Sequence, residues 1–171
     1  MIVQVLLRAL GSTAILVTLY YLLPFNDSSG WFAVTMLAIG LALLIALVTF
    51  QVRSIVASPY PGLRAVEALA TSVPLFLLLF AAAYVVMATL TAGSFSQSMT
   101  RTNALYFTVT VFTTVGFGDI TAKTEAAREL VTGQMVIDLI ILGLGARVIV
   151  GAVTRGRQRR PQDTAATQPG T

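Results

Sequence analysis

Long runs of apolar residues, separated by short polar segments, set the pattern of the first half of the chain. Residues 2–23 and 31–50 are two such runs, joined by the polar residues 26–30, and they predict a helical hairpin. A third apolar run covers residues 70–90. Each run is long enough to cross a bilayer core of about 30 Å as a helix. A secretory signal peptide is the alternative for the first run, but no small-x-small cleavage site follows it.

The second half of the chain alternates between short and long segments. Residues 91–101 are small and polar, and residues 102–113 are too short to span a membrane. We expect residues 102–113 to form a re-entrant helix that is capped by Thr102 or Asn103. A long helix is predicted for residues 125–154. The fold expected is an all-α membrane protein with four transmembrane helices, a re-entrant helix and a loop between the last two helices.

These segments divide the chain into four parts. They are an N-terminal hairpin (1–50), a loop (51–69), a helical module (70–154) and a polar tail (155–171). The tail contains two prolines and few apolar residues, so we expect it to be disordered.

The composition supports an integral membrane protein. Of the 171 residues, 56% are hydrophobic and only 11% are charged, with a mean hydropathy of +0.84. The chain has no cysteine and no histidine, which excludes disulfides, thiolate chemistry, Ser-His-Asp arrangements and most transition-metal sites. We therefore expect neither an enzyme nor a bound cofactor.

Arginine placement predicts the orientation in the membrane. The connection at residues 24–30 has no basic residue, whereas residues 51–64 carry two and residues 155–160 carry four. The positive-inside rule then places both termini and the 51–69 loop in the cytoplasm. The four arginines at residues 155–160 follow a predicted membrane span, and such a cluster typically sets the topology and contacts lipid. We therefore expect no nucleic-acid partner. The excess of Arg over Lys, with abundant Ala, is typical of a bacterial plasma-membrane protein.

Residues 113–119 are Thr-Thr-Val-Gly-Phe-Gly-Asp. Gly116 and Gly118 allow φ > 0 at alternate positions, which turns successive carbonyls toward one axis. Such a stack of carbonyl oxygens can replace the water around a dehydrated cation. A glycine-containing strand or turn is the alternative for this string.

This string, placed between a short helix and a long one, resembles the selectivity filter in the two-helix pore module of the potassium channel superfamily. The resemblance covers residues 70–154 and implies a homotetramer in which each chain supplies K⁺ ligands. The implied ligands are Thr114, Val115, Gly116, Phe117 and Gly118, which we call the filter segment. Phe117 replaces the commoner tyrosine.

The resemblance also implies residues that support the filter segment. Asp119 follows it, and Tyr106 stands where the family commonly has a tryptophan that bonds this aspartate, so a Tyr106–Asp119 brace is expected. Packing of the aromatic ring at an interface is the alternative for Tyr106. Thr110 occupies the place of a glutamate in some members, and it cannot share a proton with Asp119 as that glutamate does.

Asp138 lies about 13 residues into the last helix, about 20 Å along it and near mid-membrane. The resemblance places it where many members have a hinge glycine. It then either lines the central cavity as a charge or forms a hydrogen bond between helices. If the last helix bends, the hinge is then expected at Gly133, Gly143 or Gly145. The alternative for these glycines is close packing between helices.

The predicted function is passive, selective conduction of K⁺ across the plasma membrane by a homotetramer. A subunit of a K⁺ uptake transporter is one alternative, although such proteins usually carry four degenerate pore repeats in one chain. A non-conducting membrane scaffold is another alternative. No helix carries the ladder of basic residues that a voltage sensor needs.

Overall fold

The computed structural model describes residues 11, 13–18, 20–22, 30–56 and 61–165. Three long helices and one short one follow one another: α2 (Gly30–Val56), α3 (Pro61–Leu90), the short α4 (Arg101–Phe112) and α5 (Glu125–Ala165). Within the described residues the only strand-like pairing is an isolated bridge between Phe95 and Ala122. The expected all-helical class is confirmed for this part of the chain.

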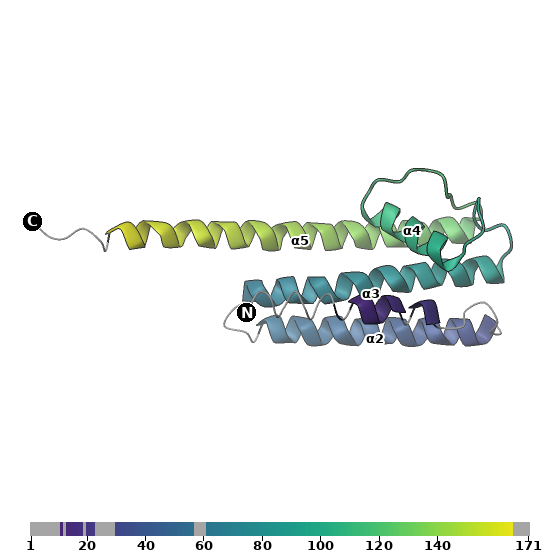
Figure 1. Ribbon diagram of the computed structural model, residues 1–171, viewed down its shortest axis with the longest axis horizontal. Coiled ribbons are helices and arrows are strands. Elements are labelled where there is room, and N and C mark those ends of the chain that lie inside the picture. Colours follow the sequence, from purple (N-terminus) through teal and green to yellow (C-terminus); the bar gives the residue numbers. More distant parts are fainter. Residues whose placement is uncertain (1–10, 12, 19, 23–29, 57–60, 166–171) are drawn as a thin grey trace, which may run out of the picture.

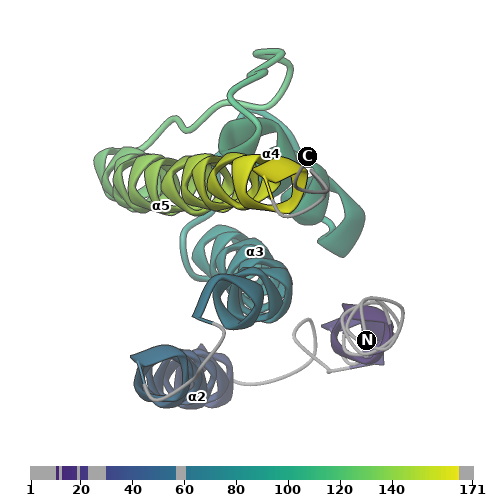
Figure 2. The same cartoon turned by 90° about the vertical axis from the view of Figure 1, so that its left-hand side faces the viewer.

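The long helices run along one axis, and α4 lies at one end of them (Figure 1). Seen along that axis, α3 lies between α2 and α5 (Figure 2). Three segments are long and apolar enough to cross a membrane: Val34–Gln51, Val66–Leu90 and Glu125–Arg147. These segments match three of the four expected spans.

The first expected span, residues 2–23, lies largely outside the described residues. What is described there is a short apolar helix, Thr13–Leu22. This helix contacts the start of α4, because the Tyr20 hydroxyl donates to the Arg101 carbonyl at 3.0 Å. The Arg101 guanidinium in turn donates to the Tyr21 carbonyl. The N-terminal segment is therefore bonded to the helical module and not separate from it.

The helix boundaries follow local sequence signals. Pro61 begins α3, as its fixed φ and missing N–H favour at a first helical position. α5 begins at Glu125, as predicted, with Thr124 Oγ1 accepting the Ala127 N–H at 3.3 Å.

The far end of α5 differs from the prediction. We expected disorder from residue 155, but α5 continues to Ala165. The low apolar content of residues 155–165 argues only against a packed core. Arg, Gln and Ala are good helix formers, and a single helix can form without a core. Residues 166–171 of the expected tail lie outside the described part of the chain.

The packed core lies where α3, α4 and α5 meet. The rings of Tyr84, Phe95 and Phe107 contact one another edge to face, with centroids 5.2–5.9 Å apart. Ala104 on α4 and Ala127 on α5 are completely buried beside them. Small residues on two helices and large rings from three segments thus fix α4 against the long helices.

Helices α2 and α3 pack closely at Gly40. A Cβ atom added there would lie 2.9 Å from Leu79 Cδ1. Further along the same pair of helices, the Ser72 hydroxyl donates to Gln51 Oε1 at 2.6 Å.

We expect substitutions at Gly40 to have graded effects on stability. Gly40→Ala should be tolerated, because the end of the Leu79 side chain can move aside. Gly40→Ile should lower the stability by about 1–3 kcal/mol, because it forces α2 away from α3. Thermal unfolding of the purified protein measures the effect, with the exposed Ala46→Ile as control. Equal losses at both positions would contradict close packing at Gly40.

Candidate functional site

Helix α4 is fixed at its first turn by Thr100. The Thr100 hydroxyl accepts the Asn103 N–H at 3.2 Å and acts as the N-cap. We expected Thr102 or Asn103 in this role, and that prediction was wrong by two or three residues. The Asn103 side chain instead donates to the Ser98 carbonyl at 2.8 Å, outside the helix.

The chain leaves α4 through bonds to the last turn of the helix. The Thr114 N–H donates to the Val111 carbonyl at 3.0 Å. The Val115 and Gly116 N–H groups both donate to the Thr110 carbonyl, each at 3.1 Å. The Thr110 backbone therefore anchors the filter segment. Sequence reasoning considered only the Thr110 side chain, which donates to the Phe107 carbonyl at 2.9 Å.

The filter segment has positive φ at alternate residues. The values are +60° at Thr114, +50° at Gly116 and +79° at Gly118. The two glycines were expected to adopt this conformation, but Thr114 was not. A positive φ at a residue with a Cβ costs about 1–2 kcal/mol, so the surrounding bonds must hold Thr114 in place.

Residues 114–119 are exposed in the single chain. The exposed fraction of the side chain is 55% for Val115 and 70% for Phe117. Helix α5 adds an exposed apolar face, formed by Met135, Val136, Ile137, Leu139, Ile140, Leu142, Leu144 and Val150. Much of the filter segment and of this face is therefore exposed within the described part of one chain.

The loop between α3 and α4, residues 91–100, holds the residues that follow the filter segment. The Gln97 side chain donates to the Asp119 carbonyl at 2.9 Å. Ser96 and Thr121 exchange two bonds, each at 2.9 Å, one from the Ser96 N–H and one to the Ser96 hydroxyl. The sequence showed only that this segment is small and polar, and it did not show which backbone groups its side chains bond.

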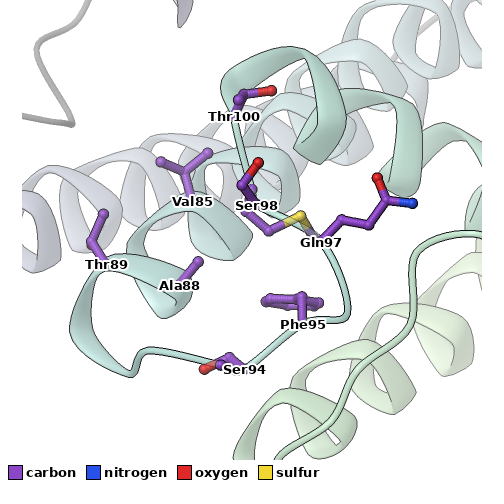
Figure 3. Close-up of a pocket in the computed structure, with 10 residues that line it drawn as sticks. Val85, Ala88, Thr89, Ser94, Phe95, Gln97, Ser98 and Thr100 are labelled. Atoms are coloured by element: carbon purple, nitrogen blue, oxygen red, sulfur yellow. The ribbon is translucent and has the colours of Figure 1, made fainter.

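A pocket of about 350 Å³ lies between the 91–100 loop and α3 (Figure 3). Val85 and Thr89 line it from the helix, and Phe95 and Gln97 line it from the loop. Since Gln97 also bonds the Asp119 carbonyl, this pocket adjoins the support of the filter segment. Its lining residues carry no charged side chain.

Tyr106 lies beside both the filter segment and Asp119. Its ring stacks on that of Phe117, with centroids 6.3 Å apart and planes 3° apart. Loss of hydration, followed by the hydrogen bond and the negative charge of Asp119, raises the pKa of the Tyr106 phenol. The two partners of the expected brace therefore lie together, and ring packing, the alternative for Tyr106, is present as well.

Asp138 lies inside the chain. Its side chain is only 2% exposed, and Oδ2 accepts the Gln134 side-chain amide at 3.1 Å. No described group forms a hydrogen bond with Oδ1. A residue enclosed by helices of its own chain does not line a cavity between chains, so the cavity interpretation does not fit this arrangement. The alternative was a hydrogen bond between helices, and the bond that Asp138 forms lies instead within α5, one turn away at Gln134.

Gln134 extends this bond to the other two helices and was missed in the sequence. It is completely buried, its Oε1 accepts the Tyr84 hydroxyl at 2.5 Å, and its Nε2 also donates to the Thr108 carbonyl at 3.2 Å. A polar residue four positions before Asp138 on one helix face was the available signal.

The three candidate hinge glycines have open surroundings. A Cβ atom added at Gly133, Gly143 or Gly145 would meet no atom within 4 Å. None of them is a close-packing point within the described chain, and α5 runs through all three as one helix. A hinge at these positions stays a prediction.

We expect the Tyr106→Phe variant to lose the bond to Asp119 and keep the ring stack. Folding raises the pKa of the Tyr106 phenol above its ordinary value of 10.0. The stability that the phenol contributes is therefore complete at a pH below 10.0. It is lost as the pH rises through the raised pKa. The difference in melting temperature between wild type and Tyr106→Phe should therefore be constant near neutral pH and shrink in strong alkali. Tyr21→Phe is the control, and a difference that grows with pH would contradict the brace.

Residues 72–155, just under half of the chain, match the sequence model of a protein family described as ion channel. The match includes α4, the filter segment and the buried bonds of Gln134. Neither the curated proteins nor the solved structures contain a match to this chain. Together with the three apolar helices, the family match supports a membrane-embedded ion channel and suggests a protein that is not an enzyme.

Proposed function

We propose that the chain is one subunit of a K⁺-selective channel that conducts passively across the plasma membrane as a homotetramer. The observation that carries the proposal is the alternation of positive φ at Thr114, Gly116 and Gly118, in an exposed segment at the end of a short helix. Alternating backbone of this kind directs carbonyls toward one axis, and rings of carbonyls are what K⁺ filters use. The match to an ion channel family over the same residues supports it.

The need for partner chains follows from the exposure of the filter segment. Non-helical backbone at membrane depth must be enclosed by protein or line a water-filled path. One chain has one filter segment, so a closed ring requires several chains, and rings of four such loops form known K⁺ filters. The exposed apolar face of α5 offers surface for the contacts between subunits.

Within the ring each residue has a defined role. Carbonyls of Thr114, Val115, Gly116 and Phe117 bind K⁺, and the Thr114 hydroxyl closes the innermost site. Gly118 supplies the turn at the outer end. Helix α4 directs the partial negative charge of its C-terminus toward the cavity, which favours a cation.

The supports act through the backbone and through one phenol. The Thr110 carbonyl fixes two amides of the filter segment, and Gln97 fixes the carbonyl of Asp119. Tyr106 acts from the side as the partner of the Asp119 carboxylate. K⁺ is the permeant ion, and the mechanism needs no cofactor. Both termini face the cytoplasm in this proposal, since the arginines gather on that side.

Two alternatives belong to other classes. In a K⁺ uptake transporter, one chain usually supplies four degenerate pore repeats, whereas this chain has one repeat with both glycines. A non-conducting scaffold would bind lipid or protein without flux. Single-channel recordings of the purified protein in planar bilayers separate the three functions, because only a channel gives unitary K⁺ currents.

The Gly116→Ala variant should lose K⁺-selective flux. The added methyl group meets no atom within 4 Å, so it acts through the backbone, where a φ of +50° disfavours alanine by about 1–2 kcal/mol. Flux of K⁺ and Na⁺ from liposomes measures the effect. Gly11→Ala, which has open space and is remote from the filter segment, should conduct as wild type does. Selective flux in Gly116→Ala would contradict the assigned role.

The detergent-solubilised particle should have the mass of four 18.2 kDa chains after the detergent is subtracted. Light scattering coupled to size-exclusion chromatography measures this mass. The physical reason is that fewer chains leave the ring of carbonyls open. A stable monomer or dimer that still gives K⁺ currents would contradict the tetramer.

A further inference from the structure

Gln134 joins three helices through one side chain. From α5, its Oε1 accepts the Tyr84 hydroxyl of α3 at 2.5 Å, and its Nε2 donates to the Thr108 carbonyl of α4 at 3.2 Å. The same Nε2 donates to Asp138 Oδ2 at 3.1 Å. The side chain has no exposed surface. All three bonds therefore lie inside the chain, away from the exposed filter segment.

The orientation of the amide is fixed by its neighbours. The oxygen faces a hydroxyl donor, and the nitrogen faces two acceptors. Turning the amide over would place its oxygen against the Thr108 and Asp138 oxygens and leave the nitrogen hydrogens directed at a hydroxyl. Tyr84 and Asp138 thus hold the amide in the one orientation that binds α4.

The bond to Thr108 lies close to the anchor of the filter segment. An α-helical carbonyl already accepts the N–H four residues later, and Gln134 uses the second lone pair of the Thr108 carbonyl. Two residues further along α4, the Thr110 carbonyl holds the Val115 and Gly116 amides. A shift or rotation of α4 at Thr108 therefore moves the atom that sets the backbone of the filter segment.

A buried amide is an expensive way to fill space at membrane depth. An apolar side chain of the same length would fill it without any hydrogen-bonding requirement, whereas an amide that loses one partner carries a penalty. The three satisfied bonds thus point to a requirement for exact placement beyond simple packing.

Building on the proposed channel function, we propose that Gln134 is a positioning residue for ion selection. Its amide holds α4 at the height and rotation at which the filter segment conducts K⁺, and Tyr84 and Asp138 hold the amide.

The test compares three full-length variants in liposomes and planar bilayers. Gln134→Met keeps the length and removes the bonds, and Tyr84→Phe removes one hydroxyl and keeps the ring contacts. Ser72→Ala is the matched control, because it removes another bond between helices, from α3 to α2, without touching α4. The open probability and the K⁺ over Na⁺ permeability ratio are measured on channels whose assembly is verified by mass.

We expect Gln134→Met to lower the K⁺ over Na⁺ permeability ratio about tenfold, the equivalent of the one net hydrogen bond that holds α4. Tyr84→Phe should lower the same quantity by a smaller factor, and Ser72→Ala should leave it unchanged. A role limited to stability would instead lower the melting temperature of all three variants and leave the properties of assembled channels intact. That result would overturn the inference.

Two further outcomes are decided by the same experiment. If Gln134→Met does not assemble, Tyr84→Phe decides alone, and wild-type selectivity in that variant overturns the inference. If wild-type protein gives no K⁺-selective current, the proposed function fails and the inference fails with it. K⁺-selective wild-type current with unchanged variants leaves the proposed function standing and removes only the role of Gln134.

Discussion

Backbone amides that leave a helix at membrane depth must find acceptors inside the protein, and this constraint governs the molecule. The filter segment begins directly after α4 and uses the carbonyls of its last turn. The Val115 and Gly116 amides share the Thr110 carbonyl, and the Thr114 amide bonds the Val111 carbonyl. Since these amides are satisfied from within the chain, the carbonyls of the filter segment are left free for an ion in the proposed ring. The position of α4 consequently sets the geometry of the site.

Three systems of contacts hold α4, each at a different place. Thr100 and the bonds between Tyr20 and Arg101 fix its beginning, and the ring cluster of Tyr84, Phe95 and Phe107 fixes one side. Gln134 reaches its middle. The ring cluster excludes water and holds α4 through apolar contacts, which are not directional. The Gln134 amide fixes the rotation of α4, because a hydrogen bond weakens steeply at the wrong angle. This division explains why the amide of Gln134 lies among the apolar side chains of the core.

The sequence predicted where the helices lie, because apolar length determines them, but the expected loop at 51–69 was too long: α2 continues to Val56 and α3 begins at Pro61. The start of α5 at Glu125 and the end of α3 at Leu90 were confirmed. The tail was misjudged because composition reports on core formation and not on helix propensity. The sequence left a cavity position open for Asp138, because its depth is readable from the sequence and its rotation relative to α3 and α4 is not. Gln134 escaped notice for the same reason, since its partners lie 50 and 26 residues away.

The anchor at Thr110 has a consequence for mutational studies. Its acceptor is a main-chain oxygen, which every amino acid carries, so replacing the threonine removes a hydroxyl and leaves the anchor in place. Substituting the side chains of α4 one by one would leave unchanged the Thr110 carbonyl oxygen, which joins the helix to the filter segment. Only changes to the main chain address this atom, such as an amide-to-ester replacement at residue 115 or 116, which deletes the donor and spares every side chain.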